Sequence, residues 1–210
     1  RHFLIPLAGK NDTYRYHQLV RDFLLERLGD ERFELLEKAG EAALKNGEIG
    51  RAVECFLAAG VREKAQKTMM EAGRKLIGRG NWQTVERWLS NFPEEEMAQD
   101  SWLALYKAQI DLNRGRIYSG ENWVNHALKA FSDAAESAGL AESRLLKAKI
   151  LRSQGQYQDS LSLLEMAIPD LQQEETKERF DPYLEQSLTL WLSGRFAEAE
   201  EVLTRALKLA

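Results

Sequence analysis

The chain has 210 residues, a net charge of −4 and a pI near 5.6, with 44% apolar and 30% charged residues. This balance is typical of a globular protein, and the length suffices for one large domain or two small ones. Lys and Arg alternate with acids at helical spacings rather than clustering, so we expect no direct contact with nucleic acid.

Cys55 is the only cysteine, which excludes an internal disulfide and a multi-thiolate metal site. It lies in an amphipathic stretch, residues 52–57, where a small buried thiol is the usual outcome. A reducing cytoplasmic compartment is therefore the default expectation. No apolar run approaches the ~20 residues that cross a bilayer, so no membrane contact is expected. The chain begins at Arg1 without a signal-peptide pattern, and we expect it to be a piece of a longer protein.

Two short β-prone runs open the chain, residues 2–7 and 13–16, and a turn rich in Gly, Asn and Asp separates them. This pattern predicts a β-hairpin. Pro6 makes the first run an edge strand, and its Phe3–Ile5 segment could support self-association of the chain through unpaired backbone groups.

A helix is predicted directly after the hairpin, over residues 17–28, and Gly29 ends it. A hairpin and one helix cannot bury themselves alone. We therefore interpret residues 1–29 as the end of a domain that is truncated upstream. The helix bears an apolar stripe at a period of 3.6 residues: Leu19, Phe23, Leu24 and Leu28.

A turn of glycine, one residue and an apolar side chain recurs five times, at intervals of 33, 35, 40 and 39 residues. Small residues stand seven positions before each glycine and, except for Phe92, twelve positions after it. Such a period predicts a stack of helical hairpins, in which small residues allow close approach and the glycine supplies a left-handed cap. The fold class is therefore all-α: a right-handed α-α superhelix of about five hairpins over residues 30–210. The glycines are Gly47, Gly80, Gly115, Gly155 and Gly194; the small residues before them are Gly40, Gly73, Ala108, Ala148 and Ser187, and those after them are Ala59, Ala127, Ala167 and Ala206.

Helix boundaries follow from glycine, proline and capping residues. Gly139 is predicted to break the chain between two helices, Gly120 to kink or interrupt the third hairpin, and Ile168-Pro169-Asp170 to end the fourth. Residues 172–177 are either a helix extension or a loop. The predicted pairs are 30–46 with 48–59, 61–79 with 81–91, 94–113 with 116–137, 140–154 with 156–168, and 182–193 with 195–208.

The run from Tyr14 to Leu28, YRYHQLVRDFLLERL, resembles the signature that closes the winged-helix part of MalT-like regulators. These are ATP-dependent transcription activators of the STAND class, often with a LuxR-type DNA-binding tail. The phrases over residues 52–60 and 88–93 are similar to the helical repeats that follow in that family. The resemblance covers residues 13–115. It implies a helical-repeat sensor joined to a nucleotide-binding domain upstream, with ATP as the cofactor of the parent protein.

Two later turns, over residues 155–160 and 194–199, resemble the tetratricopeptide-repeat turn. They support a solenoid of that type. The third repeat departs from the pattern.

No catalytic or cofactor motif is present, and we expect neither an enzyme nor a cofactor in these residues. Gly9-Lys10 lacks the other residues of a phosphate-binding loop. His2, His17 and His126 lack metal-ligand spacing, so no metal site is expected. For His17 two interpretations stay open: a structural hydrogen bond to the hairpin, or a position facing a nucleotide-binding domain.

The first helix of each hairpin should line the concave face of such a solenoid, where partners bind. Counting back from each turn glycine gives two tryptophans as stacking surfaces and four polar side chains that could orient a sugar, nucleotide-like or peptide ligand. The alternative is that both tryptophans are core residues between hairpins. The candidate residues are Arg74, Trp102, Gln109, Lys149, Arg152 and Trp191.

Two functions follow. In the first, the repeats form a sensor of a MalT-like regulator that binds an inducer molecule or a regulatory protein and relays the signal to an intramolecular nucleotide-binding domain. In the second, the repeats are a protein–protein scaffold of tetratricopeptide type without a small-molecule ligand.

Overall fold

A computed structural model describes residues 4–6, 14–172 and 181–208 of the chain. Some of the segments discussed above lie outside the described residues. These are His2, Phe3, the predicted turn over residues 8–12 and most of the predicted segment 172–177. The chain divides into two compact units, one that ends at Ala72 and one that begins at Gly73. The boundary proposed from sequence, between residues 29 and 30, stays a prediction.

The first unit begins with two short antiparallel strands, β1 (Leu4–Pro6) and β2 (Tyr14–Tyr16), so the predicted hairpin is confirmed. Helix α1 (Gln18–Arg27) follows, and the positive φ of Gly29, 52°, turns the chain into the next helix. The remaining helices of this part are α2 (Glu31–Lys45), α3 (Ile49–Ala58) and α4 (Arg62–Gly78), which continues into the second unit.

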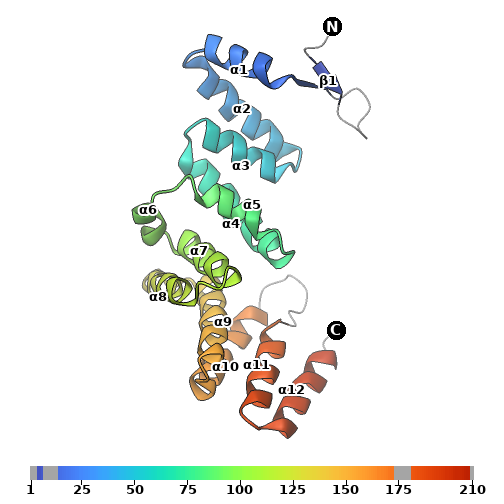
Figure 1. The fold of residues 1–210 in the computed structure, drawn as a ribbon. Helices are drawn as coiled ribbons and strands as arrows, with labels where there is room; N and C mark the ends of the chain where they lie inside the picture. Colours follow the sequence, from blue (N-terminus) through green and yellow to red (C-terminus); the bar gives the residue numbers. More distant parts are fainter. Residues whose placement is uncertain (1–3, 7–13, 173–180, 209–210) are drawn as a thin grey trace. The chain divides into compact units, whose positions relative to one another are not determined.

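In the second unit the two helices of a hairpin run antiparallel and are joined by a short turn, as between α9 and α10 and between α11 and α12 (Figure 1). Helices α9 and α10 lie side by side, as do α11 and α12. The predicted all-α class of stacked hairpins is confirmed. The helices are α5 (Trp82–Leu89), α6 (Glu94–Gln99), α7 (Ser101–Asn113), α8 (Ile117–Asp133), α9 (Ser137–Ser153), α10 (Tyr157–Gln172), α11 (Asp181–Leu192) and α12 (Phe196–Lys208).

All five predicted turn glycines adopt the left-handed conformation, with φ between 73° and 82°. In each turn the N–H of the next residue donates to a carbonyl five residues before it. Examples are Glu48 N to Ala43 O at 2.8 Å and Gln156 N to Leu151 O at 2.9 Å. This bond closes the first helix of each hairpin, and only glycine adopts the required φ without strain.

In the fourth and fifth hairpins the small residue before the turn lies where the two helices cross, whereas Gly73 of the second hairpin packs against Tyr106 of α7. In the fourth hairpin Ser160 on α10 donates its hydroxyl to the Ala148 carbonyl on α9 at 2.9 Å. In the fifth the direction reverses, and Ser187 on α11 donates to the Ala199 carbonyl on α12 at 3.0 Å. The crossing partner thus stands five residues after the glycine. The residues twelve positions after each glycine, Phe92 included, are buried.

The prediction of a single helix over residues 94–113 is wrong, because the structure has two helices there, α6 and α7. Asp100 takes an extended conformation between α6 and α7, and its carboxylate accepts from the Leu103 N–H at 2.7 Å. Asp100 is therefore the N-cap of α7. Its carboxylate satisfies the Leu103 N–H, which has no partner within the first turn of the helix. The predicted start at residue 94, after Pro93, is confirmed.

Gly139 and Gly120 do not interrupt helices, which corrects the predicted break at Gly139 and the predicted interruption at Gly120; the kink at Gly120 stays a prediction. Gly139 lies inside α9, where a Cβ atom would stand 2.1 Å from the ring of Phe131. Gly120 lies inside α8, where a Cβ atom would stand 2.8 Å from Leu112. Both glycines serve close packing, so a tertiary contact overrides their low helix propensity. The turn between α8 and α9 is formed instead at Ala135, with a φ of 52°.

Pro169 does not end the fourth hairpin, because α10 continues to Gln172. Proline has no N–H to donate to the carbonyl four residues earlier, that of Glu165. Both residues are exposed, so water can satisfy that carbonyl. Ile168 and Leu171 on the other face are buried, and their packing favours a continued helix.

Candidate functional site

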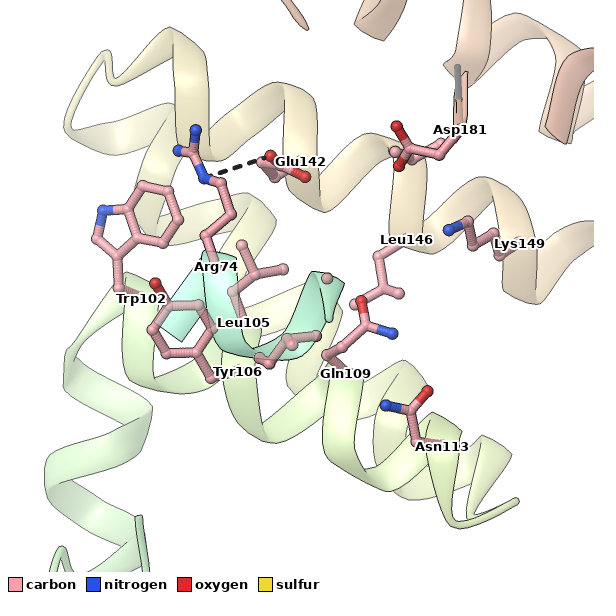
Figure 2. Close-up of a pocket in the computed structure, with 13 residues that line it drawn as sticks. Arg74, Trp102, Leu105, Tyr106, Gln109, Asn113, Glu142, Leu146, Lys149 and Asp181 are labelled. Atoms are coloured by element: carbon pink, nitrogen blue, oxygen red, sulfur yellow. Dashed lines mark ion pairs between the residues drawn. The ribbon is translucent and has the colours of Figure 1, made fainter. Parts of the chain in front are cut away.

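A cavity of about 230 Å³ lies within the second unit, on the face formed by the first helices of successive hairpins (Figure 2). Its walls come from the C-terminal part of α4, from α7 and from α9, and Asp181 at the start of α11 closes one side. This is the arrangement predicted from the repeat pattern. We call it the first-helix groove. Its lining residues are Arg74, Ile77, Gly78, Trp102, Leu105, Tyr106, Gln109, Asn113, Glu142, Leu145, Leu146, Lys149 and Asp181.

Trp102 lines one end of the groove, and its side chain is packed against neighbouring residues. The side chain is only 8% exposed, and its ring meets Phe131 edge-on with centroids 5.1 Å apart. Its indole N–H donates to Glu136 at 2.9 Å. The Arg74 guanidinium covers the ring at 5.3 Å from the centroid. These contacts favour the alternative interpretation of Trp102 as a core residue, with Arg74 as the group that faces the groove.

An ion pair crosses the groove beside this wall. Arg74 Nε lies 3.6 Å from Glu142 Oε1, which joins α4 to α9 (Figure 2). Tyr106 lies below the pair and touches the backbone of α4 where Gly73 has no side chain. Burial raises the pKa of the Tyr106 hydroxyl, so this group stays protonated. The charges of Arg74 and Glu142 therefore offset each other.

The opposite end holds Gln109, Asn113 and Lys149 (Figure 2). Among the described residues none of these three side chains has a hydrogen-bond or ion-pair partner. Apolar walls formed by Leu145 and Leu146 stand beside them. Two amides and one ammonium group can donate to a carbonyl or carboxylate, and the amides can also accept from a peptide N–H.

Two of the six candidate residues do not join the groove. Arg152 instead donates from Nε to Glu185, an ion pair that links α9 to α11. Trp191 lies on the outer face of the last hairpin, 56% exposed, with its ring edge-on to Phe196 at 6.3 Å. Arg74, Trp102, Gln109 and Lys149 come together as predicted.

The sequence interpretation missed Asn113 and Tyr106 as lining residues. Each stands four residues after a candidate on the same helix, Asn113 after Gln109 and Tyr106 after Trp102. Extending the helical spacing by one turn would have found both.

Elsewhere, His17 caps α1, where its Nδ1 accepts from the Leu19 N–H at 3.4 Å. Cys55 is half-buried rather than buried as predicted, and its partial burial raises the pKa of the thiol, which favours the protonated form. Within the described part of the chain, no group of three or more His, Cys, Asp and Glu side chains could hold a metal ion. Nor is any described helix long and apolar enough to span a membrane.

Residues 180–210, which include α11 and α12, match the tetratricopeptide repeat family. No curated protein matches the chain in sequence. Solved structures with a similar fold include the MamA protein, with a TM-score of 0.56, 13% identity and coverage of 85% of this chain and 92% of that one. Another is BtubC from P. vanneervenii, with a TM-score of 0.55, 14% identity and coverage of 92% and 91%. At these identities the likeness shows the fold alone: a tetratricopeptide-like stack of helical hairpins.

Proposed function

We propose that the protein is a non-catalytic binding scaffold, and that its first-helix groove binds an extended segment of a partner protein. The observation that carries this proposal is the unpaired polar end of the groove. Gln109, Asn113 and Lys149 lack partners within the described part of the chain, and they line a groove whose other groups are already satisfied. Gln109 and Lys149 are half-buried and Asn113 is exposed, so a ligand that completes the hydrogen bonds of the two half-buried groups is favoured.

The size of the groove favours a peptide over a compact small molecule. Its volume, about 230 Å³, falls below the ~300–1,000 Å³ of typical small-molecule sites. An extended chain needs only part of its length inside, and it presents backbone N–H and C=O groups at regular intervals. The amides of Gln109 and Asn113 suit those groups. Lys149 adds a preference for a carboxylate side chain or terminus.

A peptide selection tests this proposal. The immobilised protein is offered a random peptide library, and the selected peptides are measured by fluorescence anisotropy. We expect sequences with an Asp, a Glu or a free C-terminal carboxylate, and a loss of affinity of about tenfold or more in Lys149→Glu. The matched control is Lys129→Glu, which makes the same charge change at an exposed residue of α8 outside the groove. Equal affinity of both variants, or no selected peptide, contradicts the proposal.

A narrower form makes the module the sensor of a MalT-like regulator, with an inducer or regulatory protein as ligand and a nucleotide-binding domain as intramolecular partner. Its support is the resemblance over residues 14–28, together with the β1–β2 hairpin that runs directly into α1. Thermal unfolding against sugars, nucleotides and amino acids tests it, because a ligand at about 100 times its Kd adds about 2.7 kcal/mol of stability. A stabilising ligand whose effect is lost in Gln109→Ala supports the sensor. Binding of peptides alone supports the general scaffold.

A further inference from the structure

Gly78 lines the first-helix groove from the last turn of α4. Its φ lies outside the left-handed region, so no turn geometry requires glycine at this position. A Cβ atom placed on Gly78 would meet no atom of the described residues within 4 Å. Because glycine destabilises a helix relative to alanine, α4 itself would be more stable with a side chain here.

The other glycines of the second unit each have a structural reason. The turn glycines have a positive φ: Gly80, Gly115, Gly155 and Gly194. The remaining three stand where a Cβ atom would collide with a neighbouring side chain: Gly73 with Tyr106, Gly120 with Leu112 and Gly139 with Phe131. Gly78 has neither reason within the part of the chain that the structure describes. Residues that break a local rule without a structural return are typical of binding sites.

The repeat shows that a side chain normally stands at this position. Gly78 lies two residues before the turn glycine of its hairpin. In the neighbouring third hairpin the corresponding residue is Asn113, which also lines the groove. The missing side chain of the second hairpin therefore coincides with the wall of the groove. The corresponding residues of the other four hairpins are Lys45, Asn113, Ser153 and Leu192.

Gly78 forms its part of the wall with main-chain atoms alone, because it has no side chain. The last carbonyls of a helix have no partner inside the helix. At the end of α4 the Ile77 carbonyl accepts from the Gly80 N–H at 2.9 Å. Gly78 is exposed, and no described group donates to its carbonyl. The groove wall thus offers a main-chain acceptor that another main chain can approach closely.

Two amide side chains of α7 line the same groove at a spacing that suits an extended chain. Gln109 and Asn113 stand four residues apart on this helix, which is about 6 Å along its axis. In an extended peptide, groups on the same side recur every second residue, at roughly 6.5 Å. Each amide can donate to and accept from a peptide group. Helix α7 therefore supplies side-chain amides, and α4 a main-chain carbonyl, for one extended ligand.

We propose that Gly78 is a specificity-determining residue of the first-helix groove, because the ligand main chain lies against it and donates an N–H to its carbonyl. This inference rests on the proposed function, in which the groove binds an extended segment of a partner protein. A side chain at residue 78 would occupy the space that the ligand main chain needs.

Adding a side chain at Gly78 tests the proposal, with the peptides obtained from the random library as probes. Fluorescence anisotropy should show that Gly78→Leu weakens binding about tenfold or more, and Gly78→Ala by a smaller factor. Both variants should keep or raise the midpoint of urea unfolding, because the Cβ atom has room and both residues favour a helix. Loss of affinity is thereby separated from loss of folding.

The control is Ala42→Leu, which adds an apolar side chain at an exposed position of α2 that does not line the groove. It should leave the affinity for the same peptides unchanged. Equal losses in Ala42→Leu and Gly78→Leu would overturn the proposal.

A second measurement distinguishes a ligand main chain from a ligand side chain beside Gly78. A selected peptide is synthesised with a methyl group on one backbone nitrogen at a time. One such change should weaken binding to the unchanged protein about fivefold and have little further effect in Gly78→Leu. The two changes are not additive, because the leucine has already displaced that part of the ligand main chain.

The outcomes separate this inference from the proposed function. If Lys149→Glu weakens binding and Gly78→Leu does not, the groove binds the peptide without contact at Gly78, so only this inference is overturned. If neither variant weakens binding, or if no peptide is selected, both are overturned. A loss in Gly78→Leu without a coupled N-methyl position shows that a ligand side chain fills the space, which overturns the main-chain contact.

Discussion

The third and fifth hairpins close with the same backbone geometry but with different chemistry. In both, the N–H after the glycine donates five residues back: Arg116 N to Asp111 O at 2.8 Å, and Arg195 N to Leu190 O at 2.9 Å. The two glycines have φ angles of 74° and 82°. The residue four positions before the glycine is buried in each case. In the fifth hairpin it is a leucine, and in the third it is an aspartate.

Leu190 packs among apolar side chains of the last hairpin, including Ala199 and Val202. The fully buried Asp111 carboxylate instead accepts from Lys107 Nζ at 2.7 Å, from the Arg116 guanidinium and from the Ser119 hydroxyl. We call this buried residue and its contacts the corner of the hairpin: an ionic corner at Asp111 and an apolar corner at Leu190. The backbone geometry of the glycine turn is the same over both corners. The free energy of unfolding should differ, because the contribution of an ionic corner depends on pH and that of an apolar corner does not.

Truncation of the apolar corner should have the largest effect. Leu190→Ala removes a buried side chain and leaves a cavity, and we expect the free energy of unfolding to fall by about 3 kcal/mol. Urea unfolding at pH 7 and at pH 4 should give the same loss. The control, Leu192→Ala on the same helix, changes a side chain that is 38% exposed and should cost under about 1 kcal/mol. Equal losses in the two variants would show that the corner does not carry the stability of the hairpin.

The ionic corner should show a smaller effect that depends on pH. Burial acts to raise the pKa of the Asp111 carboxyl, but the hydrogen bonds from Lys107 and its other donors outweigh burial and hold the pKa below its usual value. Because the folded pKa is depressed, the stabilisation is fully present above the unfolded pKa of about 4. It is lost as pH falls through the folded value.

Asp111→Asn should therefore lower the free energy of unfolding by about 2 kcal/mol at pH 7. The difference from the unchanged protein should shrink as pH falls below about 4. Asp133→Asn, at an exposed position in the last turn of α8, is the control and should change little at any pH. A constant difference from pH 7 to pH 3 would contradict an ionic contribution of Asp111.

The turn glycines and the hairpin pattern could be predicted because each depends on local geometry. A left-handed φ requires glycine, and a period of 33 to 40 residues places the turns. Contacts between hairpins could not be predicted this way. Gly139 has the local character of a helix breaker, and only the position of Phe131 shows why it lies inside a helix. Likewise, the Arg116 and Ser119 donors reach Asp111 only after the chain has turned into α8, whereas Lys107 stands one turn before Asp111 on the same helix.

The candidate site residues also divide into those that local helical spacing could place and those whose position depends on packing between hairpins. Helical spacing placed Arg74, Gln109 and Lys149 correctly, because each stands on the groove side of a first helix. It failed for Arg152 because its partner Glu185 belongs to α11, whose position depends on tertiary packing. It failed for Trp191 because the groove ends at Asp181, at the start of that helix.

The turn after the third hairpin allows a test of how much glycine itself contributes. Ala135 has a φ of 52° and the same closing bond as the glycine turns, Glu136 N to Phe131 O at 3.0 Å. A left-handed alanine costs about 1–2 kcal/mol, and glycine recovers this strain but loses about 0.5–1 kcal/mol through its more flexible unfolded state. Ala135→Gly should therefore raise the free energy of unfolding by about 0.5–1 kcal/mol.

Two matched variants sharpen this smallest effect. Gly194→Ala places alanine in the left-handed turn of the fifth hairpin and should lower stability by about 1 kcal/mol. Ala134→Gly, at the neighbouring residue with a φ of −83°, relieves no strain and should be destabilising. If Ala135→Gly behaves like Ala134→Gly, the alanine turn is not strained. The third hairpin would then end in a turn whose stability does not depend on glycine, unlike the turn at Gly194.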